Sequence, residues 1–366
     1  MSMFPALSLA GGAFERGRRH GEQARERVER SLGNYARLFP FVGLAWDEAQ
    51  RRAAVFRDVI GNFDAALLEE IEGIARGAGR PFSELLALNV RTEILPATFL
   101  TGADLGECTA VAVAPAASAT GGTLLAQNWD WVGAQRASMV VLRIPEGAHP
   151  ACVTLTEAGM LAKIGFNARG FGVCLNILRS VFDRGAPGVP VHVLLRALLA
   201  RASVRDAVEF CSTLAFGGSS NILCADRGGD SASLEFSPGG LKVLRAQGGT
   251  LCHTNHFLHP EATGWQAQQA PNLSSLPRLE RALVHASARP KHGVEDLQRM
   301  LRDESDGLLS ICRKPDLSLP PEAQLETVAS VVMELGRGVM HVAPDVPSRA
   351  EYQPLGLVSE GEVALA

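Results

Sequence analysis

The stretch Glu107–Trp131, ECTAVAVAPAASATGGTLLAQNWDW, decides the fold of this chain. It contains two short apolar runs, 110–114 and 123–126, joined by a turn of small residues that ends in two glycines. Two such runs around a glycine-containing connection predict a β-hairpin. The start of its first strand lies beside the end of its second, so Cys108 and Asp130 are expected to be neighbours. A thiol that faces a carboxylate and amides has the outline of a nucleophile site.

Composition narrows the class of protein. The 366 residues suffice for one large or two ordinary domains, and 46% hydrophobic with 20% charged residues is ordinary for a soluble globular protein. The net charge of −4 argues against partners such as nucleic acid or anionic membrane surfaces. Uninterrupted apolar runs are too short for a membrane helix, and the first 12 residues lack the basic region of a signal peptide.

Cysteine usage indicates a reduced compartment. The seven cysteines form no CxxC pair, and most stand singly inside apolar runs, as buried thiols do. A cytoplasmic protein with free thiols is therefore expected, and not a disulfide framework.

Helical spacing dominates the first hundred residues. After a short strand over 4–10, helices are predicted over four ranges: 14–38, 46–60, 63–76 and 81–95. The segment 101–106, TGADLG, has the composition of a flexible linker directly before Glu107 and Cys108.

Short strands follow Cys108. Beyond the hairpin, strands are predicted at 139–144, 152–157, 161–167, 172–177, 221–226, 231–236, 241–246, 250–254, 328–335 and 338–343. Helices are predicted at 189–201, 204–214, 277–287 and 294–302. Strands and helices in separate blocks predict an α+β protein with stacked antiparallel sheets covered by helices.

Three motifs together resemble a known family. Cys108-Thr109, the run Gln127–Asp130 (QNWD) and the run His253–His256 (HTNH) are similar to the acyl-CoA:isopenicillin N acyltransferase branch of the N-terminal nucleophile (Ntn) hydrolases. The resemblance covers most of the chain and implies a four-layer αββα sandwich. It also implies a mostly helical part, 1–107, and a catalytic part, 108–366, packed as one globular unit.

The resemblance implies how the thiol is activated. In that family a precursor cuts its own chain before a cysteine, which here places the cleavage site between Glu107 and Cys108. A free thiol has a pKa near 8.5 and needs a base, whereas the new α-amine has a pKa of about 7.7–8 and can serve as one. Glu107 departs from the family, where glycine is common and allows a strained backbone before the cut.

The other candidate site residues also rest on the resemblance. Asp130 is expected to orient the new amine, and Asn255 to donate its amide N–H to the oxyanion. Gln127, Asn176 and Arg278 are expected to bind substrate or to line its pocket.

Three alternatives stay open for these residues. Arg281 could replace Arg278 as the arginine of the site. Gln127 could donate to the backbone, and Asn176 could merely cap a turn.

A metal site is the rival interpretation of the HTNH stretch. Cys252, His253, His256 and His259 lie close in sequence, as zinc ligands do. Strand geometry would send Cys252 and His253 to opposite faces, and no HExxH or CxxC accompanies them. We therefore expect no metal and no cofactor.

These inferences predict an Ntn amidohydrolase or acyltransferase with a cysteine nucleophile. Its partner would be a small-molecule amide or acyl donor, acyl-CoA among the candidates, and the acyl group would pass through a thioester. The alternative from another class is an unprocessed, inactive family member that binds a small acyl or amide ligand, and Glu107 favours it. A zinc hydrolase that uses His253, His256 and His259 is a third hypothesis.

Overall fold

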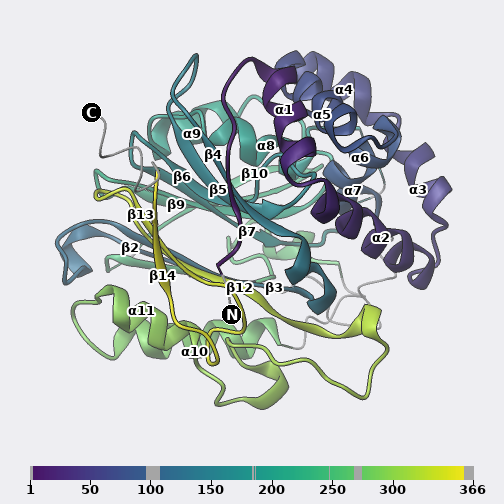
Figure 1. Cartoon of the computed structure of the whole chain (residues 1–366). Helices are drawn as coiled ribbons and strands as arrows, with labels where there is room; N and C mark the ends of the chain where they lie inside the picture. Colours follow the sequence, from purple (N-terminus) through teal and green to yellow (C-terminus); the bar gives the residue numbers. More distant parts are fainter. Residues whose placement is uncertain are drawn as a thin grey trace.

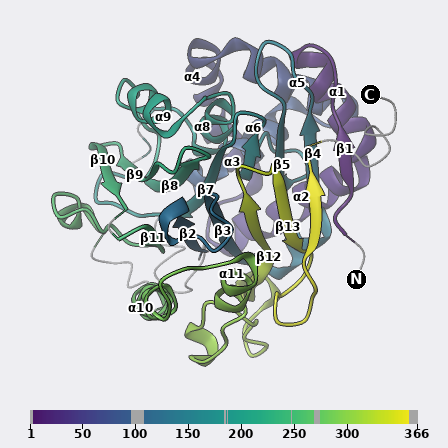
Figure 2. The ribbon, with the colours of Figure 1, turned by 90° about the vertical axis from the view of Figure 1, so that its left-hand side faces the viewer.

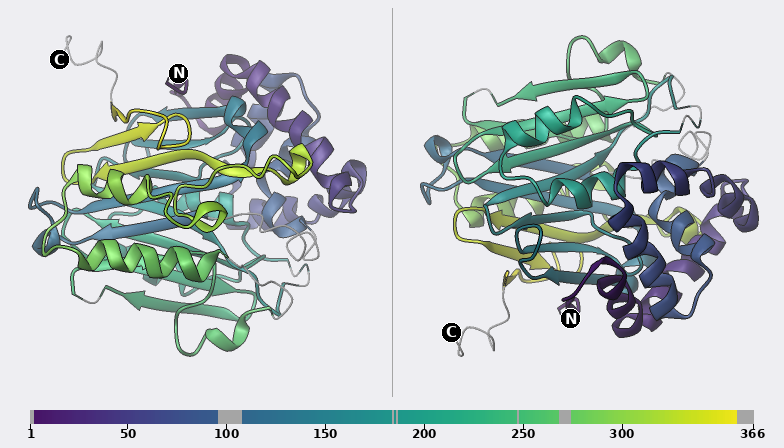
Figure 3. Two further views of the ribbon diagram at one scale, coloured as in Figure 1. Left: turned by 90° about the horizontal axis from the view of Figure 1, so that it is seen from below. Right: turned by 90° about the horizontal axis from the view of Figure 1, so that it is seen from above.

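The protein is a four-layer sandwich (Figure 1). The computed structural model describes residues 3–95, 108–267 and 274–357, apart from 184, 186 and 247. Helices α10 (Ser275–Ser287) and α11 (Val294–Leu301) cover a six-stranded sheet, and α8 (Val191–Leu198) and α9 (Val204–Cys211) cover an eight-stranded one. Figure 3 shows the two helical layers from opposite sides.

The two sheets contain all the described strands. In spatial order the larger sheet runs β1 (Ala6–Ser8), β4 (Met139–Ile144), β5 (Cys152–Glu157), β6 (Ile164–Asn167), β7 (Phe171–Ile177), β8 (Ser220–Asp226), β9 (Ser231–Ser237) and β10 (Gly240–Arg245). The smaller sheet runs β11 (Thr250–His253), β2 (Cys108–Val113), β3 (Leu124–Val132), β12 (Leu325–Glu334), β13 (Val339–Ala343) and β14 (Gln353–Gly356). All strand pairs are antiparallel except β1 with β4, an exception to the predicted antiparallel sheets.

The hairpin predicted from the opening stretch is confirmed. Strands β2 and β3 pair antiparallel from Cys108↔Trp129 to Val113↔Leu124. They lie in the middle of the smaller sheet, with α10 and α11 on one face (Figure 2). Their other face packs on the larger sheet, and Trp129 and Leu125 join the main core there. The nucleophile candidate therefore lies at the start of an interior strand, between two layers.

The N-terminal part is helical, with more breaks than predicted. Its helices are α1 (Ala13–Gln23), α2 (Arg25–Phe41), α3 (Trp46–Ala53), α4 (Phe56–Phe63), α5 (Ala65–Ala78), α6 (Phe82–Asn89) and α7 (Arg91–Ile94). The helix expected over 14–38 divides at Ala24, and the one expected over 46–60 divides after Ala53. Asp64 caps α5 by accepting the N–H groups of two following residues, so that helix begins later than predicted. The linker 101–106 and Glu107 lie outside the described residues.

Helices α1 and α5 pack with their backbones in contact. An added Cβ at Gly77 would lie 1.9 Å from the carbonyl oxygen of Arg18, and one at Gly17 would lie 2.0 Å from that of Glu70. Only glycine permits so close an approach. This pair of helices is therefore a rigid block within the N-terminal part.

A buried polar cluster joins the helical part to the sandwich. The Tyr35 hydroxyl of α2 lies 3.0 and 3.1 Å from the two carboxylate oxygens of Glu157 in β5 and accepts a 3.0 Å hydrogen bond from the indole N–H of Trp131 in β3. Arg91 of α7 pairs with Glu157 at 3.5 Å and lies over the rings of Tyr35 and Trp131. Because all four side chains are buried, the two parts share one interior.

Candidate active site

Main-chain groups of Cys108 are held from three directions. Its N–H donates to Asn255 Oδ1 at 2.7 Å. Its carbonyl oxygen accepts hydrogen bonds from Asn176 Nδ2 at 3.1 Å and from Arg278 Nη1 at 2.7 Å. The residue is 1% exposed and begins strand β2. The backbone at this thiol is thus fixed by two amides and a guanidinium.

The partners come from three elements that the fold brings together. Asn176 belongs to β7 of the larger sheet, Asn255 follows β11, and Arg278 belongs to α10. The Arg278 guanidinium also donates to Asn255 Oδ1 at 3.1 Å and to Thr109 Oγ1 at 3.1 Å. Arg281, the other candidate arginine, instead pairs with Asp303 at the surface, so Arg278 is the neighbour of Cys108.

Asp130 lies beside Cys108, as the hairpin predicted. A bulge in β12 shifts the register next to it, and Oδ1 accepts a 2.6 Å hydrogen bond from Thr327. No described residue donates to Oδ2. Burial raises the pKa of Asp130 to about 7, although the Arg278 charge and the Thr327 hydroxyl act against the shift. Asp130 is therefore a buried acid that can change its protonation near neutral pH.

The thiol itself is not activated by these surroundings. Burial raises the pKa of Cys108 to about 11; the nearby charge of Asp130 raises it further, while Lys163, the Asp130 main-chain N–H and Arg278 lower it. A nucleophile in these surroundings needs a proton acceptor.

Gln127 connects the two sheets. Its side-chain N–H donates to the carbonyl oxygen of Leu175 in β7, and its Oε1 accepts the Leu175 N–H at 3.0 Å. Both polar groups thus bind the backbone, which is one of the two roles that the sequence left open. Contact between Gln127 and substrate stays a prediction.

The histidines of the HTNH stretch bind protein groups. His253 lies 2.8 Å from Glu235 Oε1 and 2.8 Å from its neighbouring carbonyl oxygen, and His256 lies 2.6 Å from Ser275 Oγ. Burial raises the pKa of Glu235, but hydrogen bonds from His253 and two main-chain N–H groups outweigh it, so the net shift is downward. Within the described ranges, no group of three histidine, cysteine or acidic side chains is placed to hold a metal ion.

Sequence reasoning missed one charged neighbour of the site, Lys163. Its Nζ lies 3.9 Å from the ring centroid of Trp129, and the side chain is buried. The available signal was a single lysine inside the apolar run GMLAKIGF, since lysine is rarely buried. The strand predicted over 161–167 begins only at Ile164, which leaves Lys163 in the preceding turn.

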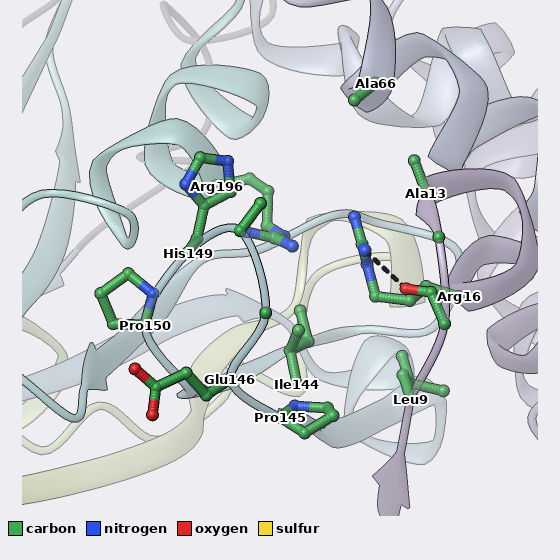
Figure 4. Close-up of a pocket in the computed structure, with 14 residues that line it drawn as sticks. Leu9, Ala13, Arg16, Ala66, Ile144, Pro145, Glu146, His149, Pro150 and Arg196 are labelled. Carbon is green, nitrogen blue, oxygen red and sulfur yellow. Dashed lines mark hydrogen bonds between the residues drawn. The ribbon is translucent and has the colours of Figure 1, made fainter.

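A separate surface pocket of about 320 Å³ lies between the start of α1 and the turn that follows β4 (Figure 4). Arg16, Arg196 and His149 line it, and it shares no residue with the surroundings of Cys108. Both arginines are paired with the single carboxylate of Glu70, and Glu146 also lines the pocket, so these four charges balance. The chemistry indicated by the sequence therefore lies elsewhere.

Comparison with known proteins gives the family. The model for acyl-coenzyme A:6-aminopenicillanic acid acyl-transferases matches residues 118–343. The 40 kDa form of acyl-coenzyme A:6-aminopenicillanic-acid-acyltransferase from Emericella nidulans is 30% identical over 316 residues, which cover 84% of each chain. This chain belongs to that acyltransferase family. The resemblance drawn from Cys108, the QNWD run and the HTNH run is confirmed.

Solved structures agree on the fold. Two variants of the conjugated bile acid hydrolase from Clostridium perfringens align with a TM-score of 0.50 at 14% and 13% identity, covering 68% of this chain and 92% of theirs. The acyltransferase-family sandwich is thus an Ntn-hydrolase fold, as expected. Among the described residues, every helix is too short or too polar to cross a bilayer.

Proposed function

We propose that the chain is a cysteine-dependent enzyme that cleaves or transfers the acyl group of a linear amide or short peptide-like substrate through a thioester on Cys108. The set of hydrogen bonds at Cys108 carries this proposal. Asn255, Asn176 and Arg278 fix the backbone on either side of the thiol, and a fixed nucleophile needs little reorganisation to react. Membership of an acyltransferase family supports the same chemistry.

The enzyme would first cut its own chain. The Cys108 sulfur attacks the Glu107 carbonyl carbon, the C–N bond breaks as the acyl group moves from nitrogen to sulfur, and water hydrolyses the thioester. The products are a carboxylate on Glu107 and a free α-amine on Cys108, hence chains 1–107 and 108–366.

The freed amine would then work with its neighbours. It accepts the thiol proton, and Asn255 Oδ1, which already accepts the Cys108 N–H, orients it. Asp130 would bind the same amine with its Oδ2, which accepts no hydrogen bond from the described residues. Asn255 would stabilise the oxyanion, and Arg278 would add positive charge.

The remaining roles concern the substrate. The name of the Emericella relative includes an acyl-coenzyme A, so we propose a small acyl donor of this kind as one candidate. Asn176 and Gln127 would line the substrate site from the face between the two sheets.

The alternative is an uncleaved family member that binds an acyl or amide ligand without turnover. Two observations favour it: glutamate precedes the cysteine, and the pKa of Cys108 is raised to about 11. Acyl-enzyme formation separates the two functions, because only the enzyme forms a bond to the ligand.

Mass spectrometry of the protein after incubation with acetyl-CoA and hexanoyl-CoA tests the proposal. We expect an acyl adduct on the Cys108 peptide that hydroxylamine removes, as a thioester requires. Cys108→Ala should form no adduct, while Cys312→Ala, which removes another buried thiol, should react like the wild type. An adduct that persists in Cys108→Ala would contradict the proposal.

A further inference from the structure

Lys163 and Cys108 lie against the same tryptophan. Cys108 is the cross-strand partner of Trp129, so both side chains point to the same face of the sheet. The ammonium group of Lys163 lies 3.9 Å from the centroid of the Trp129 ring and 5.9 Å from that of Trp131. The lysine therefore stands close to the proposed nucleophile, in an apolar and aromatic setting.

No described residue forms a hydrogen bond or an ion pair with Lys163 Nζ. The charged or titratable groups that face it are Arg91, Glu157, Cys108 and His192. Glu157 is already bound by Tyr35 and Arg91, so its charge is shared. A buried lysine without its own carboxylate is expected to lose its proton easily.

The direction of the pKa shift agrees with this geometry. Burial, with a contribution from Arg91, lowers the pKa of Lys163 to about 7, while Cys108 and Glu157 act in the opposite direction. The amine is neutral above that pH, and a neutral amine can accept a proton.

The N-terminal helices hold Lys163 in place. His20 Nε2 of α1 accepts the Gly159 N–H at 3.1 Å, and Asn89 Oδ1 of α6 accepts the Leu161 N–H at 3.0 Å. The Lys163 N–H itself donates to Thr154 Oγ1 at 3.2 Å. Side chains therefore fix the main chain of the turn between β5 and β6. The Lys163 amine is held at a defined position by this turn, although its burial is unfavourable.

We propose that Lys163 accepts the thiol proton of Cys108, directly or through one water, when the sulfur attacks. The inference rests on the proposed function and gives the uncleaved chain a base before its α-amine is free. The S–H bond breaks, its proton goes to Nζ, and its electron pair stays on sulfur for the new S–C bond. The resulting ammonium returns the proton to the departing nitrogen, so no further reactant is needed.

The reactivity of Cys108 towards iodoacetamide tests the inference. Alkylation of Cys108 would be followed from pH 5 to pH 9 by intact-mass spectrometry of freshly expressed protein. Only the full-length species is scored, because its Cys108 nitrogen is still an amide and cannot act as a base. We expect the wild-type rate to rise through a pH of about 7, where Lys163 loses its proton. Lys163→Met should lose that inflection and react at least about ten-fold more slowly above it.

Two further variants make the test specific. Lys242 also lies over a tryptophan, Trp265, but pairs with Glu261 away from Cys108, so Lys242→Met should match the wild type. Asp130 and Arg278 also face Cys108, and Asp130 titrates in the same range. Asp130→Asn should keep the inflection that Lys163→Met loses. Lys163→Arg, which cannot give up its proton, should fail like Lys163→Met.

Three results would overturn the inference: a Lys163→Met profile that superimposes on the wild type, full rescue by Lys163→Arg, or no alkylation of wild-type Cys108 at any pH. Thermal unfolding of each variant checks that it is folded. Failure of the proposed function would give a different result from failure of this inference. In that case Cys108→Ala would still form acyl adducts and turn over substrate, whichever residue is present at position 163.

Discussion

Replacing Arg278 by lysine removes the planar fork that holds the backbone at Cys108. In the native site, four of its hydrogen bonds go to Cys108 O, Thr109 Oγ1, Asn255 Oδ1 and Ser274 Oγ, at 2.7 to 3.2 Å. A lysine ammonium is a point charge and can keep one or two of them. Each bond to a charged group contributes roughly 1.5–3 kcal/mol, so the loss of two or three of them in Arg278→Lys should lower the free energy of unfolding by at least about 3 kcal/mol.

The assay is urea unfolding at fixed pH, in a Cys108→Ala background that keeps the chain uniform. Arg281→Lys is the matched control, because Arg281 lies on the same helix and pairs with Asp303 at 2.7 Å but is partly exposed. The control should cost less than about 1 kcal/mol. Equal losses for the two variants would refute the argument that Arg278 is the central support of the site.

Three further outcomes follow from particular contacts. Gly77→Ala should lower the melting temperature and reduce the free energy of unfolding by about 1–3 kcal/mol or more, because its Cβ would meet the Arg18 carbonyl. Gly33→Ala, at an uncrowded position in helix α2, should be neutral or stabilising. Equal effects of the two substitutions would contradict the close packing of α1 against α5. The folded-state pKa of Asp130 is raised from 3.8 to about 7, so the native state binds this proton more tightly than the unfolded state. The unfolding free energy of the wild type relative to that of Asp130→Asn should therefore fall by up to about 4 kcal/mol as pH rises from roughly 4 to 7. Urea titrations of both proteins give this difference, because Glu93, whose pKa burial also raises to about 7, titrates in both. Tyr35→Phe removes a hydrogen bond from the buried carboxylate of Glu157 and should lower the free energy of unfolding by about 1–3 kcal/mol in the same assay. An unchanged urea midpoint would mean that this cluster does not couple the N-terminal helices to the sandwich.

Local pattern predicted the parts of the site that depend on one hairpin. Strands β2 and β3 follow each other in the chain, joined by residues 114–123, and pair antiparallel, so the neighbourhood of Cys108 and Asp130 could be read from the sequence. The contacts of Asn255 and Arg278 could be anticipated only through the family resemblance, because residues 147 and 170 positions away from Cys108 carry no local sign of that contact.

Tertiary contacts decided what the sequence did not show. Lys163 reaches the site because helices α1 and α6 fix the turn that carries it. No periodicity or residue spacing in the sequence indicates these long-range contacts. The predicted helix over 14–38 divides at Ala24, although nothing in its apolar spacing marks a break. Strand β14 was not predicted, because its sequence QPLG contains a proline, which is tolerated only at a sheet edge such as this one.

The intact mass of the purified protein tests the central claim most directly. The claim is that the Cys108 sulfur frees its own α-amine by cutting the bond to Glu107. We predict two masses that correspond to 1–107 and 108–366 for the wild type, and one full-length mass for Cys108→Ala. A wild-type protein that stays full length while it turns over an acyl substrate at full rate would contradict the claim.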